Sequence, residues 1–281
     1  MNKRTHGISL TDLKCFTRVG RVFCVLSAYF DESYDSHTMC IGGFMATDSV
    51  WGRIEPRWAA RIRIESEISG RQGLKPLSRY HATDCASMVH EFAGWDVKRQ
   101  IHLTKRLLDI IGTGNRRVVG AKPIGVACGI AYDELRAAFP ELKTKGAVRW
   151  HAYKFCMAKC LQLILDVMRR KFPEDRVTVI YDRTEEFDSA AQSAYNAISP
   201  LGSWPTKYFV SMAPGDWQTF VALQSADMLA FEGFKKTGSS KRGEEYFRRS
   251  LRGIVCRGIP LWVGFCTPRT LQEFKQMGLS L

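Results

Sequence analysis

The chain has 281 residues, of which 45% are hydrophobic and 25% charged, a composition typical of a globular protein that buries its own core. Its 41 Lys and Arg residues exceed its 28 Asp and Glu residues, so the formal net charge is +13, which favours anionic partners, nucleic acid first. A basic surface that serves only solubility is the alternative.

No window approaches the roughly 20 apolar residues of a membrane span. The first residues also lack a signal-peptide core. We therefore expect a cytoplasmic protein with no membrane partner.

The nine cysteines are scattered and odd in number, which is typical of reduced thiols in a cytosol. Cys156 and Cys160 share one helix face, but no second pair at zinc-site spacing accompanies them. We interpret both as core residues rather than metal ligands. An oligomer is compatible with the sequence, although nothing in it indicates one.

The first elements expected are a short arm over residues 1–20 and a nearly all-apolar strand over 22–30. A strand over 37–47 follows a tight turn and predicts an antiparallel hairpin. Within it, Gly42 and Gly43 indicate a bulge or a close backbone approach.

The rest of the chain predicts a basic, helical insertion over about 48–116, whose first helix Pro56 can break in two. After it we expect the following elements: a strand within 118–132, helix 148–171, strand 177–181, helix 185–198, strand 207–212 and helix 216–236. This order predicts an α/β domain over residues 21–236 with a mixed five-stranded sheet flanked by helices. A linker at 237–243 begins a small C-terminal extension, 237–281, with two short helical patterns.

Three aspartates have unusual positions. Asp31 ends the first strand and Asp182 ends the strand after the long helix, at the sheet edge that holds sites in open α/β sheets. Asp227 lies on the core-facing stripe of the last long helix, because its neighbours on the same face are mostly apolar. A buried carboxylate needs a partner, which is either structural, such as Arg183 or backbone donors at a helix start, or a metal ion.

The three aspartates would need compensating charge if they met in one site. Two carboxylates about 4 Å apart repel by about 4 kcal/mol at an effective dielectric of about 20. Mg²⁺ and Mn²⁺ prefer carboxylate oxygen, and two such ions can activate water and stabilise the leaving oxygen of a phosphodiester. We therefore expect Asp31, Asp182 and Asp227 to bind Mg²⁺ or Mn²⁺. For Asp31 alone, a structural role in a turn is an equal alternative.

Five motifs, YFDES, IGG, YHATD, VIYDR and LQSADMLA, occur in this order between residues 20 and 235. Together they resemble the domain of unknown function 3800 family of bacterial and phage proteins. That family is similar to the ribonuclease H-like fold, whose nucleases carry acidic residues on the first strand, the fourth strand and a late helix. The resemblance implies a ribonuclease H-like fold and a metal-dependent nuclease acting on RNA or DNA, with Asp31, Asp182 and Asp227 on those elements.

A fourth acidic ligand or base is expected outside the long helix, which has no acidic residue before Asp166. Glu32 is the candidate, although side chains alternate along a strand, so Asp31 and Glu32 share a side only if the strand ends or bulges there. Glu185 and Glu186 are alternatives, with a simpler role as carboxylates in a first helical turn.

Gln224 and His81 are supporting candidates. Gln224 lies one turn before Asp227 and can orient a ligand or hydrogen-bond buried backbone. His81 can carry a proton or contact phosphate, or be a hydrogen-bonded loop residue. His151, on the long helix, either reaches the site or belongs to the core or surface.

Basic residues of the insertion are expected to bind nucleic acid, namely Arg57, Arg61, Arg63, Lys75 and Arg79. Trp51 and Trp58 would add base stacking if they are exposed. The sequence thus predicts a Mg²⁺- or Mn²⁺-dependent nuclease. A non-catalytic nucleic-acid- or protein-binding module on the same scaffold is the alternative, and a nucleotide phosphohydrolase is a third.

Overall fold

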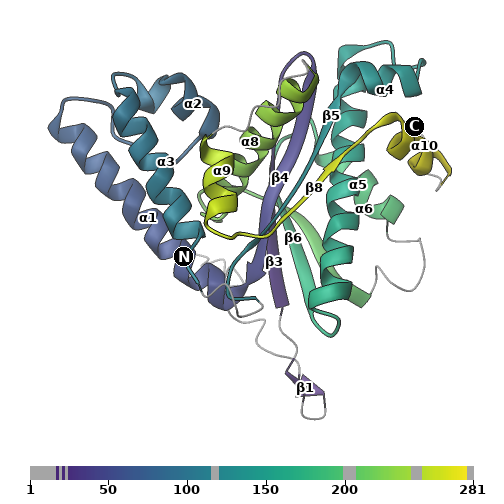
Figure 1. The fold of residues 1–281 in the computed structure, drawn as a ribbon, viewed down its shortest axis with the longest axis horizontal. Coiled ribbons are helices and arrows are strands. Elements are labelled where there is room, and N and C mark those ends of the chain that lie inside the picture. Colours follow the sequence, from purple (N-terminus) through teal and green to yellow (C-terminus); the bar gives the residue numbers. More distant parts are fainter. Residues whose placement is uncertain are drawn as a thin grey trace, which may run out of the picture.

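The computed structural model describes residues 17–18, 21–22, 25–114, 120–198, 207–241 and 249–276, so the expected N-terminal arm lies almost wholly outside it. The main sheet comprises β3 (Val25–Tyr34), β4 (Thr38–Thr47), β5 (Ile124–Ala131), β6 (Arg176–Asp182), β7 (Phe209–Gly215) and β8 (Leu261–Phe265). Their order across the sheet is β7-β6-β3-β4-β5-β8, and β4 runs antiparallel to β3 and β5 (Figure 1). The short strands β1 (Thr17–Arg18) and β2 (Arg21–Val22) pair separately. The protein is therefore an α/β protein with a mixed sheet.

The predicted antiparallel hairpin of β3 and β4 is confirmed, but β3 is longer than expected. It continues through Asp31 and Glu32 to Tyr34, so Asp31 does not end the strand. On its other side β3 pairs in parallel with β6 only as far as Phe30, opposite Tyr181. Beyond that pair, no strand within the described part of the chain lies beside this edge of β3.

The inserted helices lie together on one side of the sheet (Figure 1). They are α1 (Asp48–Arg71), α2 (Ala82–Ser87), the short 3₁₀ helix η2 (His90–Phe92) and α3 (Val97–Ile111). Pro56 does not break α1, contrary to expectation. Proline removes a hydrogen bond to the carbonyl four residues earlier, and here both Pro56 and Gly52 are exposed, so that carbonyl can be solvated.

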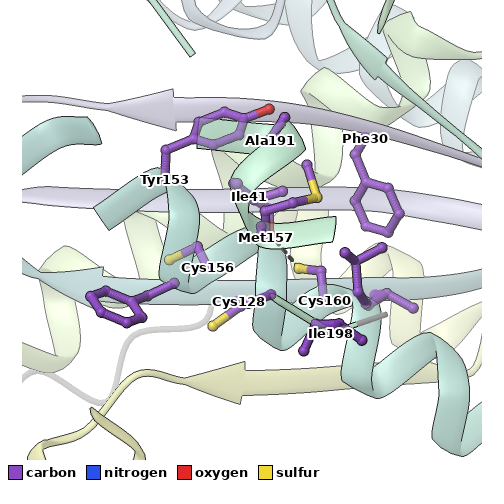
Figure 2. Packing of buried hydrophobic residues seen from close by; sticks show 14 of the residues in the cluster. Phe30, Ile41, Cys128, Tyr153, Cys156, Met157, Cys160, Ala191 and Ile198 are labelled. Atoms are coloured by element: carbon purple, nitrogen blue, oxygen red, sulfur yellow. Dashed lines mark hydrogen bonds between the residues drawn. The ribbon is translucent and has the colours of Figure 1, made fainter. Parts of the chain in front are cut away.

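Two hydrophobic cores cover the two faces of the sheet, because alternate residues of each strand point to opposite sides. Phe30 belongs to the core beneath α5 (Lys145–Lys171), whereas Tyr29 belongs to the core beneath α8 (Leu223–Lys241). The first core also includes residues of α4 (Tyr132–Ala138), α6 (Asp188–Ile198) and α10 (Pro268–Gln276), and Figure 2 shows its packing around α5. The second core includes residues of α1, α3 and α9 (Arg249–Cys256).

The sheet has six strands, not the five expected. The sixth, β8, comes from the C-terminal segment and pairs in parallel with β5 at the edge of the sheet. It is short and only partly buried, so its alternation was not distinguishable from the helical patterns around it. The expected linker also begins within a helix, because α8 continues to Lys241. Within it, the Thr237 hydroxyl donates to the Gly233 carbonyl (2.9 Å).

None of the helices in the described residues is both long enough and apolar enough to cross a bilayer.

Candidate functional site

A polar pocket of about 280 Å³ opens where β6 ends. It is lined by all four predicted acidic residues and by both supporting candidates, namely Asp31, Glu32, Asp182, Asp227, His81 and Gln224. The other lining residues are Ser33, Tyr34, Arg79, Tyr80, Thr83, Thr184, Trp217 and Leu223. Segments far apart in the sequence thus bring their carboxyl groups to one place.

The close approach of α8 to the sheet brings Asp227 to this pocket. Asp31 pairs across the hairpin with Gly42. A Cβ atom at Gly42 would lie 2.6 Å from the Ala230 backbone nitrogen, so only glycine lets α8 pack at this depth. Asp227 lies one turn before Ala230 and lines the pocket with Asp31. The predicted close backbone approach is confirmed, and β3 and β4 stay in continuous register without a bulge.

Asp31 and Glu32 both line the pocket although they point to opposite faces of β3. They do not share a side of the strand, as expected for a strand that neither ends nor bulges at Asp31, yet both reach the pocket. Because β6 ends at Asp182, no strand of the described residues lies beside this edge of β3 beyond Phe30, and the pocket extends around the end of β6. Glu32 therefore reaches it from the α5 face, where the Thr184 hydroxyl donates to its Oε1 atom (3.2 Å).

Asp227 is 6% exposed, and its structural partner is a backbone donor rather than Arg183. The Ala82 N–H, at the start of α2, donates to Asp227 Oδ2 (2.7 Å). This bond ties the inserted region to α8. Asp31 also accepts a backbone hydrogen bond, from the Glu32 N–H (2.7 Å).

Burial raises the pKa of every carboxyl group in the pocket. The pKa of Glu32 rises to about 8 and that of Asp227 to about 6, and those of Asp31 and Asp182 also rise. Neighbouring carboxylates add to the effect, since Asp227 raises the pKa of Asp31 and Asp182 raises that of Glu32. The positive charges of His81 and Arg79 partly oppose the rise at Asp227.

The donor set of this pocket fits a hard divalent cation. Glu32 Oε2 is buried and accepts no hydrogen bond from the described residues, so one carboxylate oxygen has no partner where several negative groups meet. Within the described residues, however, no three of these carboxylates place one oxygen each within 4.8 Å of one another. The groups face one pocket without closing into a single three-ligand cluster.

Gln224 and His81 both have structural partners. Gln224 Oε1 accepts hydrogen bonds from the Tyr80 N–H (2.8 Å) and from Trp58 Nε1 (3.0 Å), which is the buried-backbone role considered as its alternative. His81 precedes α2, and its Nδ1 atom lies 2.9 Å from an Asp84 carboxylate oxygen. His151 is not among the residues that line the pocket.

The basic residues predicted to bind nucleic acid have different surroundings. Arg79 lines the pocket, and Arg63 lines an adjoining cavity of about 440 Å³. Arg61 forms an ion pair with the buried Glu65. Arg57 and Lys75 are exposed on the inserted region.

Trp51 and Trp58 do not meet the condition set for base stacking, which was exposure. Trp51 is 4% exposed and Trp58 is 1% exposed, because both pack in the core beneath α8. Trp217 was expected within the helix over 216–236, but it precedes α8 and lies between the pocket and the adjoining cavity, where it contributes to both. The Arg79 guanidinium lies 4.9 Å from its ring centroid. Residues 217–219 form a turn, in which Asp216 accepts a hydrogen bond from the Thr219 N–H (2.8 Å). Aspartate is a common residue at the start of a turn, so Asp216 is the sequence signal for it.

No protein-family model matches the chain, and no curated protein is significantly similar to it.

Proposed function

We propose that this protein is a Mg²⁺- or Mn²⁺-dependent nuclease with a ribonuclease H-like core, as its resemblance to the domain of unknown function 3800 family implies. One observation carries the proposal: four carboxyl groups from β3, β6 and α8 line a single pocket, and burial raises the pKa of each. Carboxylates held this way are costly to ionise unless a cation compensates them.

The positions of the aspartates in the fold support the ribonuclease H-like assignment. In chain order, β3 is the first and β6 the fourth strand of the six-stranded sheet, and α8 follows all but the last strand. Asp31, Asp182 and Asp227 therefore lie on the first strand, the fourth strand and a late helix. This is the placement that the family resemblance implies.

Asp31, Asp182 and Asp227 would hold the metal, with Glu32 beside them. When bound, divalent ions of this kind activate water and stabilise the charge that develops on phosphate. The Thr184 hydroxyl donates to Glu32 Oε1 and so fixes one of its oxygens, and a carboxyl group held at this position can exchange a proton with water or substrate. Arg79 supplies positive charge at the pocket for a phosphate oxygen.

A polymeric substrate is favoured over a free nucleotide by the cavity that adjoins the pocket. The two cavities, of about 280 and 440 Å³, share Trp217 and Gln224. Trp217 offers an aromatic face on which a base next to the cleaved phosphate can stack. Arg63, in the adjoining cavity, can contact a further phosphate.

A non-catalytic binding module is the second candidate. Two observations favour it: no three carboxylates of the described residues come within 4.8 Å as a ligand group, and Asp227 already has a backbone partner. Such a module would bind nucleic acid through its basic residues, and Mn²⁺ would leave its melting temperature unchanged. A nuclease site would show a rise in melting temperature with Mn²⁺.

The deciding experiment measures cleavage of labelled single-stranded RNA and DNA by the full chain, with Mg²⁺ or Mn²⁺ and with chelator. We expect Asp182→Asn to lower the metal-dependent rate by about 10³-fold or more, because several kcal/mol of charge stabilisation are lost. Asp166→Asn is the matched control, since Asp166 is an exposed carboxylate of α5 that pairs with Arg169 (3.1 Å). Equal rates for Asp182→Asn and the control, or no cleavage by the unmodified chain with any substrate and metal, would rule out the nuclease.

A further inference from the structure

Three buried cysteines form a cluster apart from the acidic pocket. Cys128 lies on β5, Cys156 on α5, and Cys266 directly after β8. Their Sγ atoms all lie within 4.8 Å of one another, and those of Cys128 and Cys266 are 3.5 Å apart. The exposed fractions are 0%, 0% and 1%, so the cluster is closed to solvent (Figure 2 shows Cys128 and Cys156 in their core).

The spacing of these thiols matches that of ligands around one thiophilic ion. A metal–sulfur bond of about 2.3 Å places the sulfurs of a tetrahedral or trigonal site about 3.8–4.0 Å apart. Among the described residues, this is the one group of three His, Cys, Asp or Glu side chains whose ligand atoms lie within 4.8 Å of one another. The acidic pocket, by contrast, does not meet that criterion.

Backbone pairing fixes two of the three positions, those of Cys128 and Cys266, and the packing of α5 places Cys156. Cys128 pairs with Gly264 in the parallel β5–β8 register, and the Cys266 N–H donates to the Gly129 carbonyl (2.9 Å). A Cβ atom at Gly264 would lie 3.1 Å from Cγ of Lys159, so glycine lets α5 pack closely against β8. The cluster therefore joins the C-terminal segment to the sheet and to α5.

Ordinary packing of small apolar side chains is the simpler account of a buried cysteine, and it describes Cys160 well. Cys160 lies one turn after Cys156 on the same helix and is equally buried, but its thiol is directed to the Ile41 carbonyl (3.7 Å). Cys40 likewise donates to that carbonyl (3.5 Å). Packing alone explains these two thiols. The Cys128 thiol also lies near a carbonyl, that of Gly129 (3.9 Å), but it is closer to Cys266 Sγ (3.5 Å), and Cys156 completes a group of three that converge on a common point.

We propose that Cys128, Cys156 and Cys266 together bind one thiophilic d¹⁰ ion, Cu⁺ or Zn²⁺, which fastens β8 and the segment after it to the core. Each thiol that becomes a ligand releases its proton to solvent. The described residues add no fourth His, Cys, Asp or Glu to the group, and Cu⁺ is stable with three thiolates. Zn²⁺ would need a fourth donor.

The test uses the full chain, reduced with a phosphine and freed of metal by a chelator. Zn²⁺ is then added in competition with a colorimetric chelator, and Cu⁺ in a separate anaerobic titration against a Cu⁺-specific chelator. We expect one ion per chain, thiolate-to-metal absorption in the near ultraviolet, and a melting temperature that stops rising at one equivalent. The arm with the tighter binding identifies the ion.

Cys156→Ala is the test variant and Cys160→Ala its matched control, since both remove a buried thiol from one face of α5. We expect Cys156→Ala to weaken metal binding by more than about 100-fold. Loss of a residue that only orients a metal ligand costs about 10- to 100-fold in metal affinity, and loss of the ligand itself costs more. Cys160→Ala should bind like the unmodified chain. Equal binding by the two variants, or no ion bound by the unmodified chain in either arm, would overturn the proposal.

X-ray absorption of the unmodified chain with the ion bound identifies the atoms around the ion. This measurement needs no substitution, so it does not depend on whether a variant folds. We expect a shell of three sulfur neighbours at about 2.3 Å. A shell of nitrogen and oxygen alone would contradict the proposal even if an ion is bound. Neither result depends on whether the acidic pocket is a nuclease site.

Discussion

The acidic pocket and the cysteine cluster lie along one row of the sheet, yet their surroundings differ completely. Glu32 pairs with Ile41, and Ile41 pairs with Cys128 across β3, β4 and β5. Residues directly opposite one another in antiparallel strands point to the same face. Glu32 and Cys128 therefore both face α5, two strands apart, one in a polar pocket and the other in a dry core.

The difference follows from what lies beside each strand. On one side of the hairpin β6 has ended at Asp182, and the open edge of β3 becomes a pocket lined by carboxylates. On the other side β8 pairs with β5 at the level of Cys128, and α5 covers the row. Where a neighbouring strand stops thus decides whether the same row holds hard oxygen donors near water or soft sulfur donors away from it.

The largest expected effect separates the two sites. Asp227→Asn should lower metal-dependent cleavage by about 10³-fold or more and leave the binding of Zn²⁺ or Cu⁺ unchanged. Cys156→Ala should weaken the binding of Zn²⁺ or Cu⁺ by more than about 100-fold and leave cleavage unchanged. Cleavage assays and metal titrations on both variants check this, and a variant that lost both properties to the same degree would show that the sites are not independent.

A second prediction concerns the depth at which α8 packs. Gly42→Ala places a Cβ atom 2.6 Å from the Ala230 backbone nitrogen, so we expect a loss of about 1–3 kcal/mol in the free energy of unfolding. Gly52→Ala is the control, because a Cβ there meets nothing within 4 Å and should stabilise α1 by about 0.5–1 kcal/mol. Urea unfolding measures both, and a loss at Gly42 no larger than at Gly52 would refute the packing argument.

Much of the fold could be predicted because its signals are local. The hairpin, α3, α5 and β6 carry strong apolar periodicity, and Asp227 was placed on the core side from neighbours one turn away. Features set by distant segments could not be predicted in this way. Glu32 reaches the pocket only because β6 ends beside it, and β8 is too short and exposed to reveal itself as the sixth strand.

The residues of the two proposed metal sites also differ in how far the sequence could predict that they meet. Asp31, Asp182 and Asp227 were expected to meet because each has an unusual place in its own element. Cys128 and Cys266 have no such mark, since they come together only through the β5–β8 pairing and the packing of α5. Spacing along the chain, the usual sign of a zinc site, carries no information about a cluster drawn from three separate elements.

A third, smaller effect concerns nucleic-acid binding. Trp217→Ala should weaken the binding of single-stranded nucleic acid by about tenfold, the value of one stacked base. Trp262→Ala is the matched control, because Trp262 also lies under an arginine, Arg170 (5.3 Å), but on β8, where it lines neither cavity. Fluorescence anisotropy with catalytically inactive Asp182→Asn protein measures both, and equal effects would remove Trp217 from the binding surface.

The most gradual effect is the dependence of stability on pH. Glu32 and Asp227 bind a proton more tightly in the folded chain than in the unfolded chain, with pKa values raised to about 8 and about 6. Their ionisation therefore disfavours folding, and the melting temperature of the metal-free protein should fall as pH rises from about 4 to 8. In Glu32→Gln protein this fall should be shallower. Identical slopes for the two proteins would show that Glu32 is not held in its protonated form by the fold.

Anomalous scattering from a crystal of the full chain soaked with Mn²⁺ is the sharpest test of the proposed metal site. We expect Mn²⁺ in the pocket, bound by oxygens of Asp31, Asp182 and Asp227, with Glu32 turned toward it. A pocket without anomalous density at saturating Mn²⁺, in which the Asp227 carboxylate keeps its bond to the Ala82 N–H and Arg79 alone neutralises Asp182, would contradict it.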